Sequence, residues 1–212
     1  MDEKDSNFLY TKNPSVFTVL CRLHNHCYVD MANYQDLKTQ IDRLVVVVRS
    51  IGIKNALTEG NANPHLAFWR FIYGSMLDIA VIEWCKVFGT DNQPTHWKKF
   101  ISDHDAFTKK LLSFLGTTQD QWDQYWQHMT HYRNSHAAHH LGVKEGDTYP
   151  VLDMALKSSF FYYSKLIEKV KGLGVNNLPE SLEAYSKQFN EQAFKVAKAA
   201  LASTNDIKEE VF

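Results

Sequence analysis

Residues 119–141 read QDQWDQYWQHMTHYRNSHAAHHL, and this stretch decides how the chain folds. An α-helix turns by roughly 100° per residue, so side chains three and four positions apart share a face. In this stretch the large apolar side chains repeat at that spacing: Trp122, Tyr125, Trp126 and Met129. Such a face is typical of a helix that packs against a core. The stretch therefore predicts one long helix with an aromatic stripe, ending near Gly142.

Helical spacing continues along most of the chain, with glycine and proline at the breaks between segments. The run Leu44–Val48 is rich in β-branched residues, but Ile41, Leu44 and Val48 fit helix spacing, so we expect a helix there. No segment alternates convincingly as a strand would. The expected helices cover roughly residues 16–57 (one helix or a pair), 63–88, 97–101, 106–115, 119–141, 150–171 and 182–201.

These helices predict an all-α helical bundle. A chain of 212 residues is long enough to bury a core as one domain. We expect a flexible N-terminal tail over residues 1–15, a single helical domain over 16–203 and a C-terminal tail over 204–212.

Composition excludes several classes of protein. The net charge of −1 provides no overall positive field, so any RNA contact must rest on a local patch. Three cysteines fit a reducing compartment better than a disulfide framework, and we expect Cys85 to be a buried, unreactive side chain. The polar N-terminus does not resemble a signal peptide, and the longest aliphatic run is too short to cross a bilayer. We therefore expect a cytoplasmic protein without membrane association.

Five of the ten histidines lie between His128 and His140, close to one of only five arginines. On a regular helix, Arg133, His136 and His140 would continue the aromatic stripe toward the C-terminus. Cationic groups on a core-facing surface need a carboxylate to pair with, a water-filled cleft or a second subunit that completes their environment. Glu83 is the best carboxylate of the 63–88 helix for pairing with Arg133 or orienting an imidazole, and an ordinary structural ion pair is the alternative. Asp78 is expected on the opposite side of that helix.

Arg133-Asn134, followed by Ala138-His139-His140, resembles the arginine-x(4–6)-histidine motif of HEPN domains. An asparagine after the arginine and a small residue before the histidine are also typical of that motif. The order of helices over roughly residues 63–170 is similar too, and the resemblance implies a bundle in which two long helices, 63–88 and 119–141, run antiparallel with accessory helices around them. Within the family, the abortive-infection U-type and related phage-defence proteins resemble this chain most. The commonest spacing in the family would fall on Ala138, whereas this chain offers His139 or His140. Helix geometry favours His140 beside Arg133, and the alanine–histidine order favours His139.

The resemblance implies a homodimeric, metal-independent endoribonuclease that acts as a toxin or phage-defence effector and needs no cofactor. Arg133 would grip the phosphate, Asn134 would fix the arginine or a histidine, and His139 or His140 would act as general acid or base. His136 and Glu83 would support this site. RNA is the implied substrate, and a nucleotidyltransferase-type antitoxin is a possible partner.

Two other readings remain open. The first is a HEPN-like module that binds RNA, a nucleotide or a partner without catalysis, which fits the near-neutral charge and the unusual spacing. The second is a metal site, because His136 and His140 stand four positions apart. Residues 124–144 contain no carboxylate, which argues against a di-iron bundle of Glu-x-x-His units. The sequence also lacks a phosphate-binding glycine loop and a serine nucleophile elbow.

Overall fold

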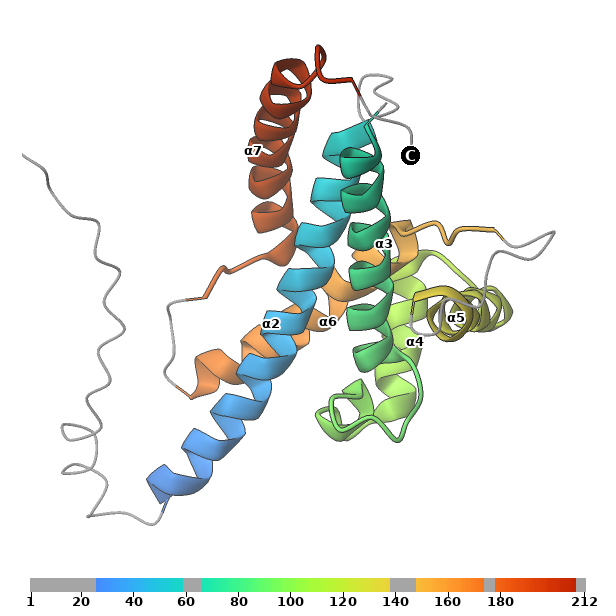
Figure 1. The fold of residues 1–212 in the computed structure, drawn as a ribbon. Helices are drawn as coiled ribbons and strands as arrows, with labels where there is room; N and C mark the ends of the chain where they lie inside the picture. Colours follow the sequence, from blue (N-terminus) through green and yellow to red (C-terminus); the bar gives the residue numbers. More distant parts are fainter. Residues whose placement is uncertain (1–25, 59–65, 138–147, 174–177, 209–212) are drawn as a thin grey trace, which may run out of the picture.

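The computed structural model describes residues 26–58, 66–137, 148–173 and 178–208, with side chains from residue 34 onward (Figure 1). Every regular element in these ranges is a helix, which confirms the all-α class. The predicted boundary at residues 15 and 16 lies outside the described residues. In chain order the elements are α2 (His26–Thr58), α3 (Ala67–Phe88), the short 3₁₀ helix η2 (Trp97–Lys99), α4 (His104–Leu115), α5 (Gln119–Tyr132), the π-helix η3 (Arg133–Ala137), α6 (Asp153–Gly172) and α7 (Leu182–Ser203).

Local chemistry explains several helix ends. The Asp103 carboxylate accepts a backbone hydrogen bond at the start of α4, and the Ser181 hydroxyl does the same for α7. Thr118 and Gln121 form a reciprocal capping box that starts α5. Gly116 ends α4 in the left-handed conformation, with φ of 64°, which a glycine adopts without strain.

The long helices α2 and α3 lie side by side, and α7 packs along α2 (Figure 1). Helix α6 crosses α2, while α5 and α4 contact α3 and α6 respectively. The β-branched run of α2 is helical, as predicted: Leu44, Val47 and Val48 are buried and Val46 is partly exposed. This pattern follows from helix periodicity, since one face of α2 meets its neighbours and the other meets solvent.

The core centres on Trp84 of α3, which is fully buried. Its indole ring stacks on Phe88 at a centroid distance of 5.3 Å and meets Trp122 and Tyr125 of α5 at 5.9 and 5.6 Å. The indole Nε1–H donates a hydrogen bond of 3.0 Å to the Ser158 hydroxyl of α6. Trp84 thus connects three helices, and a buried indole needs such a partner for its N–H.

The aromatic stripe of α5 faces this core, as its spacing predicted. Trp122 and Met129 are buried. The Tyr125 hydroxyl accepts a hydrogen bond of 3.0 Å from the Ala155 backbone N–H, and Trp126 Nε1 donates to the Phe88 carbonyl at 2.8 Å. The polar ends of these rings therefore fix α5 against the start of α6 and the end of α3.

The connector between α3 and α4 is held by His96, of which only 2% is exposed. Its Nδ1 accepts a hydrogen bond of 3.3 Å from the Lys98 backbone N–H, and its Nε2 lies 3.4 Å from the Asp91 carboxylate. Burial lowers the pKa of this imidazole to about 4, although the Asp91 charge opposes the shift. His96 is consequently a neutral, structural histidine near neutral pH.

Replacing Ser158 by alanine should lower the free energy of unfolding by about 1–3 kcal/mol, because the Trp84 N–H would stay buried without an acceptor. Ser203→Ala is a matched control, since its exposed hydroxyl bonds only the carbonyl of its own helix. Denaturant unfolding measures both variants. Equal losses in the two variants would contradict the role assigned to the Ser158–Trp84 hydrogen bond.

Acid should destabilise the protein through His96. Between about pH 6.5 and about 4 the unfolded chain binds a proton at His96 that the folded protein does not, so stability falls as pH falls. Each unit of pKa shift is worth about 1.4 kcal/mol. The comparison is denaturant unfolding of wild type and His96→Asn, which keeps an acceptor near Nδ1. We expect the wild type to lose more stability across this window, and parallel pH profiles would contradict the assignment.

Candidate functional site

The end of α5 departs from a regular helix at the residues that the sequence singled out. Arg133 caps α5, and the backbone then continues as the π-helix η3 through Ala137. A π-helix has wider turns than an α-helix and is frequent at functional sites. The prediction of one regular α-helix over 119–141 is therefore wrong for residues 133–137, and residues 138–141 lie outside the described part of the chain. The segment that begins at Arg133 still packs against α3, as the stripe predicted, but the regular α-helical spacing from Arg133 to His136 is lost in the π-helix.

Arg133 and Asn134 form a unit within this π-helix. The arginine Nε and Nη2 groups both donate to the Asn134 side-chain oxygen, at 3.0 and 2.7 Å. The Arg133 side chain is half-buried, and Asn134 is exposed. The amide thus fixes the guanidinium plane, which is one of the two roles that the sequence suggested for Asn134. No carboxylate in the described part of the chain pairs with Arg133.

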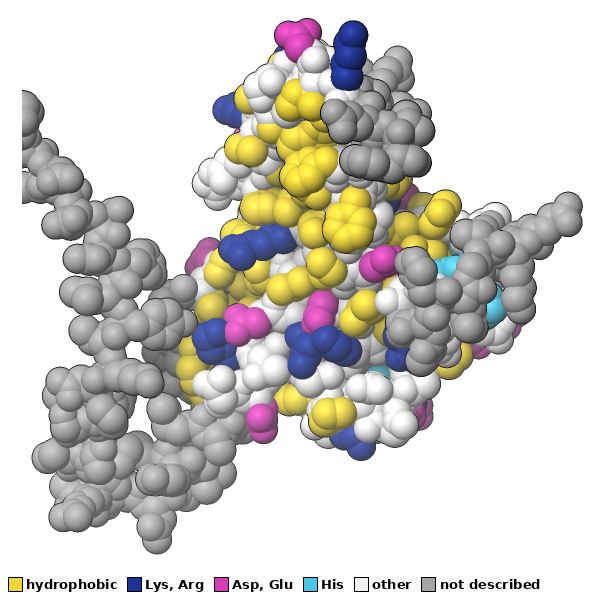
Figure 2. Space-filling view, in the orientation of Figure 1, with side chains coloured by type: hydrophobic (Ala, Val, Ile, Leu, Met, Phe, Trp, Pro, Cys, Tyr) yellow, Lys and Arg dark blue, Asp and Glu magenta, His cyan; other side chains and the backbone are white. Residues whose placement is uncertain are grey.

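His136 lies against aromatic rings at the end of the π-helix. Its imidazole meets the Tyr132 ring at a centroid distance of 5.2 Å and the His131 ring at 6.5 Å. Tyr132 also contacts Tyr149, which approaches from the segment before α6, at 6.0 Å. Figure 2 shows histidine side chains on the surface at this side of the molecule, beside α5. The structure therefore brings Arg133, Asn134 and His136 into one short surface segment with a tyrosine at its base.

Asp78 is the residue that the sequence analysis missed. Its carboxylate accepts a hydrogen bond of 2.8 Å from the Tyr132 hydroxyl, so it faces α5 and the π-helix. Burial and the hydrogen bond to Asp78 raise the pKa of Tyr132, which stays protonated as a donor. A single helical wheel places Asp78 opposite the stripe that contains Glu83. The wheel does not show that α3 is covered on both sides, by α2 and by α5.

Glu83 does not support Arg133. One carboxylate oxygen accepts from Arg43 of α2 at 2.7 Å, and the other accepts from Lys86 at 2.5 Å. Glu83 is thus the ordinary structural ion pair that the sequence analysis held as the alternative. The reason is position: Glu83 meets α2, where Arg43 supplies a cation from across the helix pair.

Cys85 of α3 is buried next to α5, and its thiol is not suited to act as a nucleophile. It is fully buried, and its thiol lies 3.7 Å from the Met129 carbonyl. Burial raises the pKa of the thiol to about 12, and the positive charge of Arg133 lowers it only in part. The expectation of a buried cysteine is confirmed, and the π-helix that begins at Arg133 packs against α3, the helix that carries Cys85.

His139 and His140 lie outside the described residues, so the choice between them as partner of Arg133 remains a prediction. The possible metal pair of His136 with His140 lies partly outside as well. Among the residues that are described, no group of three or more histidine, cysteine, aspartate or glutamate side chains gathers as metal ligands. His128 binds the Thr148 carbonyl at 2.9 Å and holds the segment before α6 to α5.

Comparison with protein-family models, with curated proteins and with solved structures finds no match for this chain. None of the helices in the described ranges has the length and apolar character needed to span a bilayer.

Replacing Tyr132 by phenylalanine should lower the free energy of unfolding by about 1–2 kcal/mol, because the Asp78 carboxylate loses its donor while the ring contacts remain. Tyr149→Phe is the matched control, since the Tyr149 ring is exposed and contacts the Tyr132 ring. Thermal and denaturant unfolding give the comparison. A Tyr149→Phe loss as large as that of Tyr132→Phe would contradict the importance of the Tyr132–Asp78 bond.

Proposed function

We propose that this protein is a HEPN-like, metal-independent endoribonuclease that acts as a toxin or phage-defence effector. The observation that carries the proposal is the Arg133–Asn134 unit. It is a guanidinium that one neighbouring amide orients, that no described carboxylate neutralises and that lies partly exposed in a π-helical turn. Arginine in this state suits a phosphate, which it can bind through two parallel hydrogen bonds.

In the proposed reaction the RNA supplies its own nucleophile, and the protein supplies the acid, the base and the positive charge. The 2′-hydroxyl is the nucleophile, and an imidazole of His139 or His140 removes its proton. The 2′-oxygen then bonds to phosphorus while the bond to the 5′-oxygen breaks, and a second imidazole returns a proton to that leaving oxygen. The products are a 2′,3′-cyclic phosphate and a 5′-hydroxyl. Arg133 stabilises the added negative charge of the phosphorane-like transition state. Asn134 accepts from Nε–H and from one Nη2–H, so the two parallel bonds to phosphate come from the second Nη2–H and from Nη1.

A homodimer would supply the second imidazole. The surface next to Tyr132 supports the proposed dimer, since the large hydrophobic side chains Tyr149 and Val151 are 67% and 68% exposed. Apolar side chains exposed next to polar ones are common at protein interfaces. In the proposed assembly, two cytoplasmic subunits face each other across one RNA cleft, each through its residues 133–137, which we call the Arg133 segment. A nucleotidyltransferase-type antitoxin is the proposed partner.

A non-catalytic module that binds RNA or a nucleotide is the second candidate. The π-helix favours it, because Arg133 stands in a wider turn and not in the regular helix that a fixed arginine-to-histidine spacing would require. Catalysis tolerates little displacement of an acid or base, whereas phosphate binding by Arg133 needs only the guanidinium.

The test is cleavage of labelled RNA in EDTA by wild type, Arg133→Ala, His139→Ala and His140→Ala. Arg70→Ala, which removes an exposed arginine of α3, is the matched control. We expect Arg133→Ala to cut at least about 100-fold more slowly, as losing one charge-stabilising group does in other enzymes. The expected ends are 2′,3′-cyclic phosphates, and the histidine whose loss abolishes cleavage is the acid or base.

Three outcomes separate the readings. Equal cleavage by wild type and Arg133→Ala would reject the nuclease proposal. RNA binding without cleavage, weakened in Arg133→Ala but not in Arg70→Ala, would establish the binding module instead. A monomer by sedimentation at the assay concentration, together with full activity, would reject the shared dimer cleft.

A further inference from the structure

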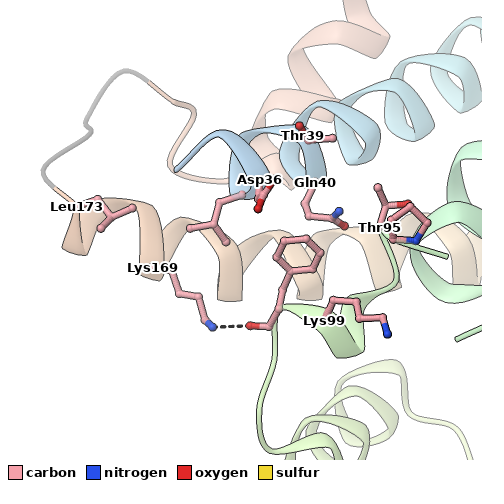
Figure 3. A pocket seen from close by; sticks show the side chains of 10 residues that line it. Asp36, Thr39, Gln40, Thr95, Lys99, Lys169 and Leu173 are labelled. Atoms are coloured by element: carbon pink, nitrogen blue, oxygen red, sulfur yellow. Dashed lines mark hydrogen bonds between the residues drawn. The ribbon is translucent and has the colours of Figure 1, made fainter. Parts of the chain in front are cut away.

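A pocket of about 700 Å³ lies away from the Arg133 segment, where α2 faces the end of α6 and the connector after α3 (Figure 3). Its volume is in the range of small-molecule sites in proteins. The residues that matter for recognition come from three parts of the chain: Asp36 and Gln40 of α2, Thr95, Lys99 and Phe100 of the connector, and Lys169 of α6.

Gln40 is the unusual member of the lining. Its side chain is fully buried, yet neither its Oε1 nor its Nε2 has a hydrogen-bond partner in the described part of the chain. Figure 3 shows the carboxamide pointing from α2 into the pocket. Each unsatisfied buried polar atom costs about 1–3 kcal/mol. A ligand group that offers a donor beside an acceptor would satisfy both atoms at once.

Charge in the lining favours an anion. Lys169 donates to the Phe100 carbonyl at 2.5 Å, which holds its ammonium group at the wall of the pocket. Lys99 forms no ion pair with any described residue. Asp36 is the one acidic residue of the lining, so the charged side chains sum to a positive value. Phe100, Leu37 and Leu173 provide apolar surface between the polar groups.

We propose that this pocket binds a small organic anion that carries a planar, amide-like edge. The edge pairs with the Gln40 carboxamide, the anionic group reaches Lys99, and the planar part lies on the apolar lining, while Lys169 adds positive charge on the other side of Phe100 (Figure 3). A mononucleotide and an N-acylated amino acid both present this chemistry, one with a phosphate and the other with a carboxylate. The site does not depend on the proposed nuclease, because it shares no residue with the Arg133 segment.

The experiment is calorimetric titration of the full chain with adenosine monophosphate, uridine monophosphate, N-acetylglutamate and inorganic phosphate, each at millimolar concentration. We expect one of the organic anions to bind saturably. Gln40→Met, which keeps the length of the side chain without its polar atoms, should weaken that binding at least about tenfold, equivalent to about 1.4 kcal/mol. Lys99→Gln should also weaken it. Lys109→Gln, on the exposed face of α4, is the matched control and should not.

The same variant tests the premise without a ligand. Because Gln40→Met removes two unpartnered polar atoms, it should raise the melting temperature of the unliganded protein. A fall in that temperature would mean that the Gln40 amide is already satisfied, and the proposal would be overturned. It would also be overturned if no organic anion binds, if Gln40→Met binds as well as wild type, or if inorganic phosphate binds as tightly as every organic anion. Nucleotide binding without N-acetylglutamate binding, or the reverse, identifies the source.

Discussion

The buried indole of Trp84 is the constraint on which the arrangement of the helices depends. A side chain of this size must be surrounded, and its single N–H must have an acceptor inside the core. Phe88, the α5 rings and Ser158 meet these two needs from α3, α5 and α6. The direction of α5 follows from that packing, and with it the place where the Arg133 segment emerges at the surface.

Much of the fold could be predicted because its signals are local. The capping box of Thr118 and Gln121 and the glycine of the α4 end act within one turn of chain, so the sequence alone locates these helix boundaries to within two residues. The Leu44–Val48 run was the harder case, since its residue types favour strands while its spacing favours a helix. The run is helical because one face of α2 is buried against α3, α6 and α7.

The candidate site was less predictable because its geometry is tertiary. The residue types of Arg133 and Asn134 pointed to the segment, and their hydrogen bond follows from adjacency. The carboxylates were assigned the other way round, since Glu83 pairs with α2 and Asp78 meets Tyr132. A helical wheel describes one helix and cannot show which neighbour covers each side. It also assumes regular turns, whereas the backbone widens at Arg133.

The π-helix has a further consequence for how this segment tolerates changes in length. A π-helical turn is equivalent to an α-helix into which one extra residue has been inserted. Deleting a single residue between Arg133 and Ala137 would allow the chain to regain α-helical hydrogen bonding, because the wide turn already holds the extra residue, whereas a deletion inside the regular helix α5 would rotate its two halves by roughly 100° relative to each other. The turn that carries Arg133 is therefore the place in this helix where a one-residue deletion is best tolerated, and the same change within α5 would misalign its aromatic stripe.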